Sequence, residues 1–373
     1  MAERLLVEQE FRRLPFAEWQ RLEWGHPALR PEVLGALVGS AAAAPQPHYF
    51  LLQDEAGVAA AAICTVVEPG RVRSADALIF GRAAPLLSRL GARKRPVLQV
   101  RAPLGGHSSV ALRPAPAHDQ VRLLGLLLDG IETHAASHSL DLAFIGVAHD
   151  DQRLREALRV RGYLDTQIHP TAVMRITWID FEGYHGMLKL RSRVAARTAR
   201  GERNRNRRRG VTIRRVQTGP KEAEALFRLL RDHHRLKNGW DPPFGAQFLI
   251  SLAEQLGNDF LLFEAVREGR RVGMLGGVRW GSVAWLPWYG MEPRDRPNDF
   301  TYMNLVFYHL ADAASTLGLD TLLYGNAALD AKRRRGCDIH ANHLYYRPHS
   351  VGVRWLLRPY FWAHRQWYWR KLQ

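Results

Sequence analysis

The same order of predicted elements occurs twice along this chain, and that repetition constrains its fold more than any other feature. In the first half, two strand patterns meet at a tight turn that ends at Gly57, and in the second half a similar pair meets at Gly269. Each hairpin is followed by a long helical pattern, a strand, a short helix and an Arg-Gly pair, at Arg161 and again at Arg335. This order predicts two α/β units of similar build, each with a mixed sheet.

A direct alignment supports the duplication. The segment 132–146 aligns without gaps on 311–325 with four identities, a modest number because Ala, Leu and Gly are common here. The order of elements is the stronger argument, and 373 residues suit two domains of ordinary size. We therefore predict an N-terminal domain over 1–170 and a C-terminal domain over 171–373, the latter with a basic helix before its hairpin and an aromatic tail.

Positive charge is concentrated in the second half. The formal net charge is +17, yet residues 1–170 hold 19 Lys and Arg against 18 Asp and Glu, while 171–373 hold 34 against 18. The segment 189–215 alone contains twelve basic residues and a single acid, Glu202. Arginine outnumbers lysine throughout, as is typical of a GC-rich genome, but such a bias does not explain the clustering.

The basic segment has a helical pattern. If residues 187–209 form one helix, Leu188, Ala195 and Ala199 share a narrow apolar stripe. Guanidinium groups match phosphate oxygens without reading base sequence, although a solvated helix face would show the same pattern. The run by itself does not distinguish tRNA from DNA, an anionic membrane or a nucleotide-bearing cofactor. On the side of this helix away from the apolar stripe, an arc of roughly 140° contains six arginines. They are Arg193, Arg197, Arg200, Arg203, Arg207 and Arg208.

Other features narrow the class of protein. Two cysteines are too few for a disulfide framework or a zinc cluster, and the histidines at 233–234 and 340–343 lack ligand companions, so we expect no metal. The N-terminal residues run into charge instead of an apolar signal core. The longest apolar stretch, 58–67, is about half a membrane span. We therefore expect a cytoplasmic protein without a transmembrane segment.

Three segments of the second half carry a family resemblance. The first is 178–211, which contains Tyr184, His185, Leu188 and the basic run from Arg191. The second is Trp288-Tyr-Gly290 at a strand end. The third is Tyr324-Gly-Asn326, followed by the turn Ala331–Gly336. Together with the duplicated layout, they resemble the FemAB-like group of the GNAT acyltransferase superfamily. The resemblance covers most of the chain and implies a tandem GNAT fold and transfer of an acyl or aminoacyl group to an amine.

The chain departs from this family in two places. In one subgroup the helix after the aromatic strand begins with an acid, where this chain has Tyr302-Met-Asn304. The helical hairpin that some bridge transferases use for tRNA is also missing. A peptidoglycan substrate therefore does not follow from the resemblance, and cell-wall and antibiotic-type pathways both stay open.

The expected chemistry indicates which residues form the site. Acyl transfer passes through a tetrahedral oxyanion, which needs a fixed positive donor. Lys332 matches the family's lysine and is one of only six lysines in the chain, although a solvated lysine in a basic turn is an equal interpretation. Trp285, Trp288 and Tyr289 share one predicted strand and form either a flat wall for the substrate or part of the core. We place Lys332, Asn326 and Tyr289 at the catalytic site, and Trp285, Trp288, Tyr302 and Asn304 around the substrate.

The donor is inferred from a missing motif. CoA-dependent members usually carry Arg/Gln-x-x-Gly-x-Gly/Ala between a strand and a helix, and this chain has no match. We therefore predict aminoacyl-tRNA as the donor, with no bound cofactor and with tRNA, not DNA, as the partner. The alternatives are an acyl-CoA-dependent N-acyltransferase and a non-catalytic RNA- or anion-binding protein. The acceptor and the oligomeric state stay open. The predicted phosphate-binding residues are Arg191, Arg193, Arg197, Arg200, Arg203, Arg207, Arg334 and Arg335.

Overall fold

A computed structural model describes residues 3–40, 46–69, 79–80, 84–89, 95–292 and 299–372 of the chain. The chain divides into two compact units. The first unit consists of Met1–Gly25, Ala43–Pro170 and His340–Gln373, and the second of His26–Ala42 and Thr171–Ile339. These units differ in two segments from the expected domains over 1–170 and 171–373. The segment 26–42 belongs to the second unit, and the segment 340–373 belongs to the first.

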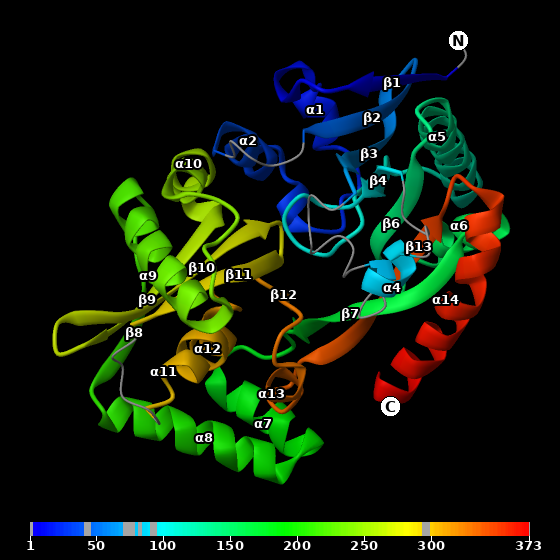
Figure 1. The fold of residues 1–373 in the computed structure, drawn as a ribbon. Helices are drawn as coiled ribbons and strands as arrows, with labels where there is room; N and C mark the ends of the chain where they lie inside the picture. Colours follow the sequence, from blue (N-terminus) through cyan, green and yellow to red (C-terminus); the bar gives the residue numbers. More distant parts are fainter. Residues whose placement is uncertain are drawn as a thin grey trace. The chain divides into compact units, whose positions relative to one another are not determined.

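The first unit contains most of the early strands and the last helix (Figure 1). Its strands are β1 (Arg4–Glu8), β2 (Pro47–Asp54), β3 (Gly57–Val67), β4 (Val97–Val100), β5 (Val110–Leu112), β6 (Asp141–Ala148) and most of β13 (Asp338–Arg347), while β7 (Leu164–Arg175) begins here and ends in the second unit. Its helices are the 3₁₀ turn η1 (Phe11–Arg13), α1 (Phe16–Trp19), α4 (Ala84–Arg89), α5 (Ala117–Ser137), α6 (Gln152–Val160) and α14 (Val351–Leu372).

The sheet of the first unit has the order β1-β2-β3-β4-β6-β13, with β5 paired to β3. The predicted hairpin is present as β2 and β3, whose ladder closes at Asp54↔Gly57. The strands β4 and β6 are parallel, and β13 runs antiparallel to β6. This last pairing is the reason that residues after 340 belong to the first unit. The helix α5 covers the sheet with a buried stripe at Leu123, Leu127 and Ile131.

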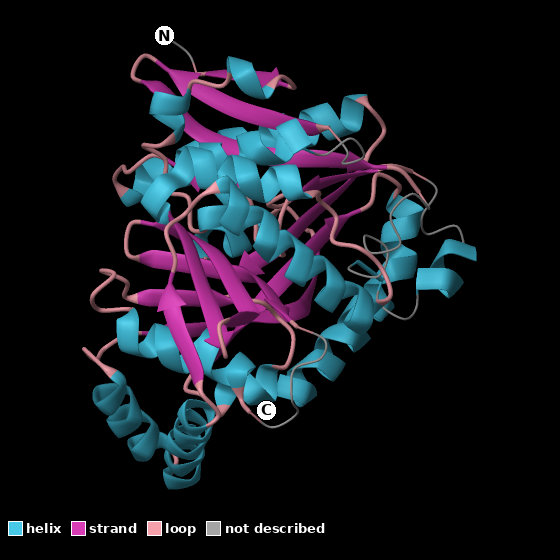
Figure 2. Ribbon diagram, turned by 90° about the vertical axis from the view of Figure 1, so that its left-hand side faces the viewer, coloured by secondary structure: helices cyan, strands magenta, loops and turns pink. Residues whose placement is uncertain are grey.

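The second unit has the remaining elements. Its strands are β8 (Val211–Arg215), β9 (Phe260–Arg267), β10 (Arg270–Trp280), β11 (Val283–Met291), β12 (Thr321–Tyr324) and the end of β7. Its helices are η2 (Pro27–Leu29), α2 (Pro31–Ser40), α7 (Phe181–Arg191), α8 (Arg193–Arg208), α9 (Pro220–Asn238), α10 (Ala246–Leu256), η4 (Gly257–Asp259), α11 (Thr301–Met303), the π-helix η5 (Asn304–Tyr308), α12 (His309–Ala313) and α13 (Leu329–Arg333). The ribbon views in Figure 1 and Figure 2 show helices packed around the strands.

The sheet of the second unit has the order β7-β12-β11-β10-β9-β8. Its hairpin is β9 and β10, which again confirms the predicted turn. The strands β11 and β12 are parallel and pair only between Val283–Trp285 and Thr321–Leu323. Beyond that point β11 continues to Met291, whereas β12 ends at Tyr324. Both units thus combine an antiparallel hairpin with a parallel strand pair, which agrees with the mixed sheet predicted for each half.

The basic segment is not one helix, in contrast to the prediction for 187–209. The backbone is extended at Ser192, which ends α7 and caps α8 by accepting a hydrogen bond from the Ala195 N–H. The buried stripe of α8 consequently starts at Ala196 and continues through Ala199 to two polar side chains, Glu202 and Asn206, while Ala195 is only half-buried.

Candidate active site in the second unit

A β-bulge lies in β11 close to the point where it separates from β12. The register with β10 runs from Gly276↔Trp288 to Val278↔Trp285, so β11 has one more residue than β10 in this interval. Pro287, which has no backbone N–H to donate, lies within the bulge. On β10, a Cβ at Gly277 would lie 2.4 Å from the Trp285 carbonyl oxygen, so only glycine fits opposite. The bulge reverses the sheet face on which successive β11 side chains lie.

This reversal separates the three aromatic residues of this strand, for which a substrate wall and a place in the core were the two interpretations. Trp285 and Trp288 lie together, with ring centroids 5.3 Å apart, and both are almost fully buried. Trp288 packs against Phe248 of α10, and Trp285 contacts His26. Tyr289 instead packs against the core cluster that contains the π-helix. The two tryptophans are therefore part of the core below α10, and of the three only Tyr289 stays a candidate for the site.

An aromatic layer connects the end of β11 to the end of β12. Tyr289 lies 5.0 Å from Tyr302, Tyr302 lies 6.1 Å from Phe307, and Phe307 lies 5.0 Å from Tyr324, all between ring centroids. His233 of α9 contacts the Tyr289 ring as well, at 5.0 Å. Burial raises the pKa of Tyr289 and Tyr302, so both phenols stay protonated at neutral pH and can donate hydrogen bonds.

Lys332 is buried at the C-terminal end of this layer. Its side chain is 6% exposed, and its ammonium donates a hydrogen bond to the Gly325 carbonyl, directly after β12. Burial lowers the pKa of Lys332 to about 8. The Cys337 N–H donates to the Lys332 carbonyl at 3.1 Å, and Tyr302 packs against the same core cluster as the buried Cys337 side chain. We call Tyr289, Tyr302, Lys332 and Cys337 the Lys332 cluster.

The Lys332 cluster has the groups that an acyl transfer requires. An ammonium has three N–H donors, and Gly325 takes one of them, so the others can stabilise an oxyanion. With a pKa of about 8, the Lys332 amine is mostly charged at neutral pH and loses its proton as the pH rises through about 8. Asn326 is exposed in the loop that follows Gly325, where it is free to contact a bound substrate.

A buried ion pair holds α8 against the π-helix. Arg335 donates to both oxygens of Glu202, at 3.0 and 2.9 Å, and the Tyr308 hydroxyl donates to the same carboxylate. Tyr184 donates to the Arg335 carbonyl, which fixes α7 in the same network. Arg335 was predicted to bind donor phosphates, and the structure commits its guanidinium to Glu202 instead. This network positions Arg335 as a support for the neighbouring Lys332 turn.

A cavity of about 270 Å³ opens beside α8 in the second unit. Two of its basic side chains, Arg203 and Arg207, come from α8, and its polar residues include the predicted substrate residue Asn304. Asn304 is buried and donates to the carbonyls of Phe300 and Glu202, so it holds the start of the π-helix in place. π-Helical turns are frequently found at functional sites. The lining residues are Arg203, Asn206, Arg207, Val211, Thr212, Ile213, Asn304, His309 and Asp312.

The predicted phosphate-binding arginines fall into two groups. Four have partners within the protein: Arg191 with Asp338, Arg200 with Glu182, Arg203 with Asp312, and Arg335 with Glu202. Arg203 lies at the edge of the arginine arc nearest the buried stripe, which explains its pairing and its contact with the Phe181 ring. The other four are exposed and contact no carboxylate in the described part of the chain, namely Arg193, Arg197, Arg207 and Arg334.

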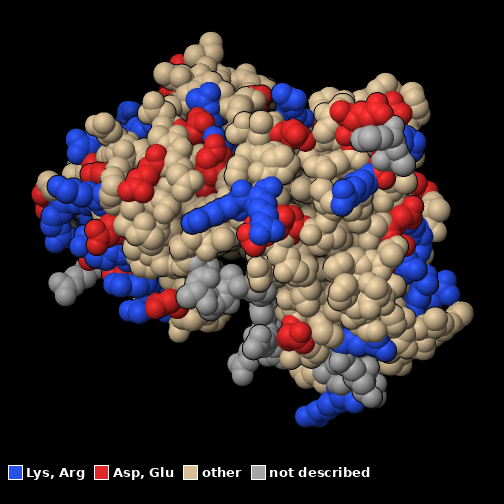
Figure 3. Space-filling view, turned by 90° about the horizontal axis from the view of Figure 1, so that it is seen from above, with Lys and Arg blue, Asp and Glu red and all other residues tan. Residues whose placement is uncertain are grey.

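Three of these exposed arginines lie on α8, and we call Arg193, Arg197 and Arg207 the α8 arginine face. Their side chains face solvent along a 16-residue helix. By contrast, on the face of the molecule shown in Figure 3, acidic side chains lie among most of the basic ones. Unpaired guanidinium groups aligned on one helix face favour an extended polyanion as their ligand.

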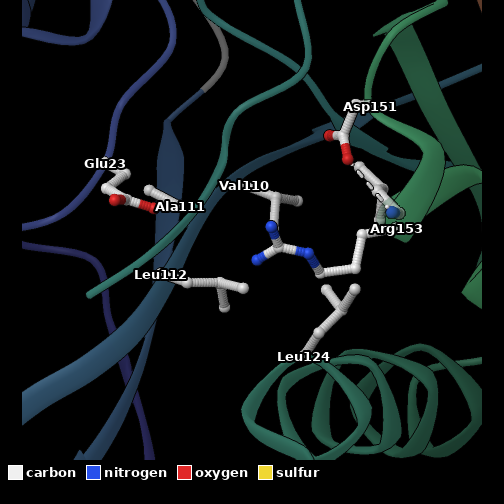
Figure 4. A pocket seen from close by; sticks show the side chains of 8 residues that line it. Glu23, Val110, Ala111, Leu112, Leu124, Asp151 and Arg153 are labelled. Atoms are coloured by element: carbon white, nitrogen blue, oxygen red, sulfur yellow. Dashed lines mark hydrogen bonds between the residues drawn. The ribbon is translucent and has the colours of Figure 1, made fainter. Parts of the chain in front are cut away.

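The first unit has a smaller cavity, of about 160 Å³. Figure 4 shows Arg153 reaching into it beside Val110 and Leu112. Arg153 donates to the Gln120 side-chain oxygen, and the Gln120 amide donates to Glu23 at 3.3 Å. Because the protein's own hydrogen-bond chain crosses this space, we take the second unit as the location of the candidate active site.

Comparison with known proteins agrees with the fold. Residues 193–333, from the start of α8 to the Lys332 turn, match the acetyltransferase (GNAT) domain family. The structure of FemX has a TM-score of 0.59 at 11% identity and covers 93% of this chain and 97% of that chain. The C-terminal domain of a putative lysylphosphatidylglycerol synthetase from Agrobacterium fabrum gives 0.54 at 10%, with 89% and 90% covered. L-PGS from Bacillus licheniformis gives 0.51 at 12%, with 83% and 87% covered. No curated protein matches the sequence.

Residues 193–333 are an acetyltransferase domain of the GNAT type, which supports an acyltransferase activity for the chain. Its architecture is that of the FemAB-like, tandem GNAT proteins, which confirms the fold predicted from the duplicated sequence. Among the described helices, none has the length and apolar content that crossing a bilayer requires.

Sequence reasoning missed the residues that support the site. Glu202 is the one acid among twelve basic residues in 189–215, and this isolation was a signal that its carboxylate has a partner. Cys337 follows the Arg-Gly pair, and nothing in its sequence context marks it as a neighbour of Lys332. The bulge in β11 was indicated only by Pro287 inside an otherwise regular strand pattern.

Proposed function

We propose that this GNAT acyltransferase takes its acyl group from an aminoacyl-tRNA and transfers it to an amine or hydroxyl of a small-molecule or peptide precursor. The observation that carries the proposal is the α8 arginine face. Its three guanidinium groups have no carboxylate partner in the described part of the chain, and Arg207 also lines the cavity beside the π-helix. A nucleic acid backbone supplies the regularly spaced phosphates that such a face fits.

The Lys332 cluster completes the proposed reaction. In the proposal, the acceptor amine or hydroxyl attacks the aminoacyl ester carbonyl, and the Lys332 ammonium stabilises the oxyanion that forms. The ester C–O bond then breaks, the tRNA leaves as an alcohol after taking a proton, and the acceptor loses one. The lysylphosphatidylglycerol synthetases, by name, form a lysyl derivative of a phospholipid, so a lipid hydroxyl is a further acceptor class to test.

An acyl-CoA donor is the second candidate, because the matched domain family is described as an acetyltransferase. Two donors that differ in size make different contacts. In this proposal a tRNA would contact arginines along the length of α8, whereas CoA would need only a local phosphate site. Ligand-induced stabilisation separates them, because a ligand that binds the folded state raises its melting temperature.

The test measures binding of an aminoacyl-tRNA mixture by fluorescence anisotropy across a series of salt concentrations. The variant Arg193→Glu/Arg197→Glu reverses two charges of the α8 arginine face, and Lys221→Glu/Arg228→Glu, which reverses two charges on the exposed side of α9, is the matched control. We expect the α8 variant to bind at least tenfold more weakly, with a shallower salt dependence, and the control to resemble the wild type. Equal weakening by the control, or stabilisation by acyl-CoA and not by tRNA, contradicts the proposal.

A further inference from the structure

The C-terminal helix α14 is anchored to the first unit along one side. Leu357 and Phe361 are buried in a cluster with Tyr346, whose ring stacks on Phe361 at 5.9 Å. The Tyr360 hydroxyl donates to the Phe80 carbonyl, and Arg365 pairs with Asp165 at 3.1 Å. The helix (red in Figure 1) is therefore a fixed part of the first unit.

The opposite side of α14 exposes large apolar side chains to water. Val351, Trp355 and Trp362 are 69%, 65% and 62% exposed. At 100° per residue these three lie within about 40° of one another, on the side away from Leu357 and Phe361. Tryptophan in this position is unusual, because an exposed indole ring gives up the hydrophobic stabilisation that burial provides. We call Val351, Trp355 and Trp362 the α14 tryptophan stripe.

The charge of α14 is of one sign. Residues 351–372 contain five Lys and Arg and no Asp or Glu. Arg358 is exposed beside the tryptophan stripe, with its guanidinium 5.2 Å from the centre of the Trp355 ring. Its charge therefore lies at the edge of the stripe, where an anionic partner would meet both the ring and the guanidinium.

We propose that the α14 tryptophan stripe docks this protein on an anionic lipid surface. Indole rings favour the interface between headgroups and acyl chains, and arginine binds lipid phosphates there. A second copy of this chain fits less well, because a symmetric contact would bring the exposed Arg358 side chains of two helices without acids toward each other. Since no described helix meets the length and apolar content of a membrane span, α14 would lie in the plane of the interface and not cross it.

Co-sedimentation with vesicles tests this inference. The full-length protein is mixed with vesicles of phosphatidylcholine alone or with about one third phosphatidylglycerol, at near-physiological salt. The test variant is Trp355→Ala/Trp362→Ala, which removes two exposed rings and no core contact of Leu357 or Phe361. The matched control is Trp240→Ala, a tryptophan that is equally exposed, at 65%, in the second unit.

We expect the wild type to bind the anionic vesicles and the double variant to bind at least tenfold more weakly, which corresponds to about 1.4 kcal/mol. The Trp240→Ala control should keep wild-type binding. Three results overturn the inference: no binding by the wild type, unchanged binding by the double variant, or binding lost only when Arg193 and Arg197 are reversed. Sedimentation velocity provides the remaining check, because a dimer that the double variant abolishes would assign the stripe to a second copy instead.

Discussion

Replacing Lys332 by methionine should raise stability and abolish most of the activity. Burial lowers the pKa of Lys332 from the ordinary 10.5 to about 8, which corresponds to about 3 kcal/mol against the charged form in the folded protein. A methionine of similar length carries no charge and so avoids this cost. The lost hydrogen bond to Gly325 offsets little, because Gly325 is exposed and water can replace the ammonium. We expect Lys332→Met to be more stable than the wild type by about 2 kcal/mol at pH 7.

The advantage of the variant should depend on pH. At pH 7 the lysine is charged in both the folded and the unfolded chain, so the folded state bears the full cost. Between about pH 8 and 10.5 the folded protein loses the proton while the unfolded chain keeps it, so wild-type stability rises relative to the variant. Urea unfolding at pH 7, 8.5 and 10 measures this difference, and Lys221→Met, at an exposed lysine of α9, serves as the control.

The same substitution removes the proposed oxyanion donor. Loss of one such donor typically lowers kcat by about 100- to 1,000-fold. For the wild type, kcat/KM should fall as the pH rises through about 8, because the charged amine is the active form. If Lys332→Met is less stable than the wild type at pH 7 and keeps its activity, the lysine is a structural residue and the assignment is wrong.

Two further predictions concern the support of the site. Glu202→Gln should destabilise the protein by about 3–5 kcal/mol in urea unfolding, because Arg335 would keep a buried, unpaired charge; Glu182→Gln, which breaks an exposed pair, should change stability by less than about 1 kcal/mol. Similar effects of the two variants would show that the buried pair is not special. Gly277→Ala should cost about 1–3 kcal/mol and lower activity as well, because its Cβ collides with the Trp285 carbonyl at the bulge. An unchanged melting temperature for Gly277→Ala would contradict the assigned bulge geometry.

Local patterns made the repeated architecture predictable from the sequence. The hairpin turns at Gly57 and Gly269 are fixed by adjacent residues, and both are present in the structure. The exchange of the last strand was not predictable, because β13 follows the second copy in sequence and pairs with β6 by a non-local ladder. No local signal in a single sequence reports such a pairing.

The site was predicted in part. Lys332 was identified from the resemblance and from its rarity in an arginine-rich chain, but its burial depends on how α13 packs. Trp285, Trp288 and Tyr289 were grouped because they share one predicted strand, and one extra residue in β11 places the two tryptophans together on the face away from Tyr289. The break at Ser192 was readable as a helix N-cap, although the apolar periodicity around it indicated a continuous helix.

The central claim is that the acyl group comes from tRNA, and transfer of a radiolabelled aminoacyl group tests it most directly. Purified protein is incubated with charged, labelled tRNA and a panel of amine, hydroxyl and lipid acceptors, with and without ribonuclease pretreatment. We predict labelled acceptor that forms only with intact tRNA and is reduced at least 100-fold in Lys332→Met. Transfer that resists ribonuclease, or that occurs only when acyl-CoA replaces the tRNA, would contradict the account.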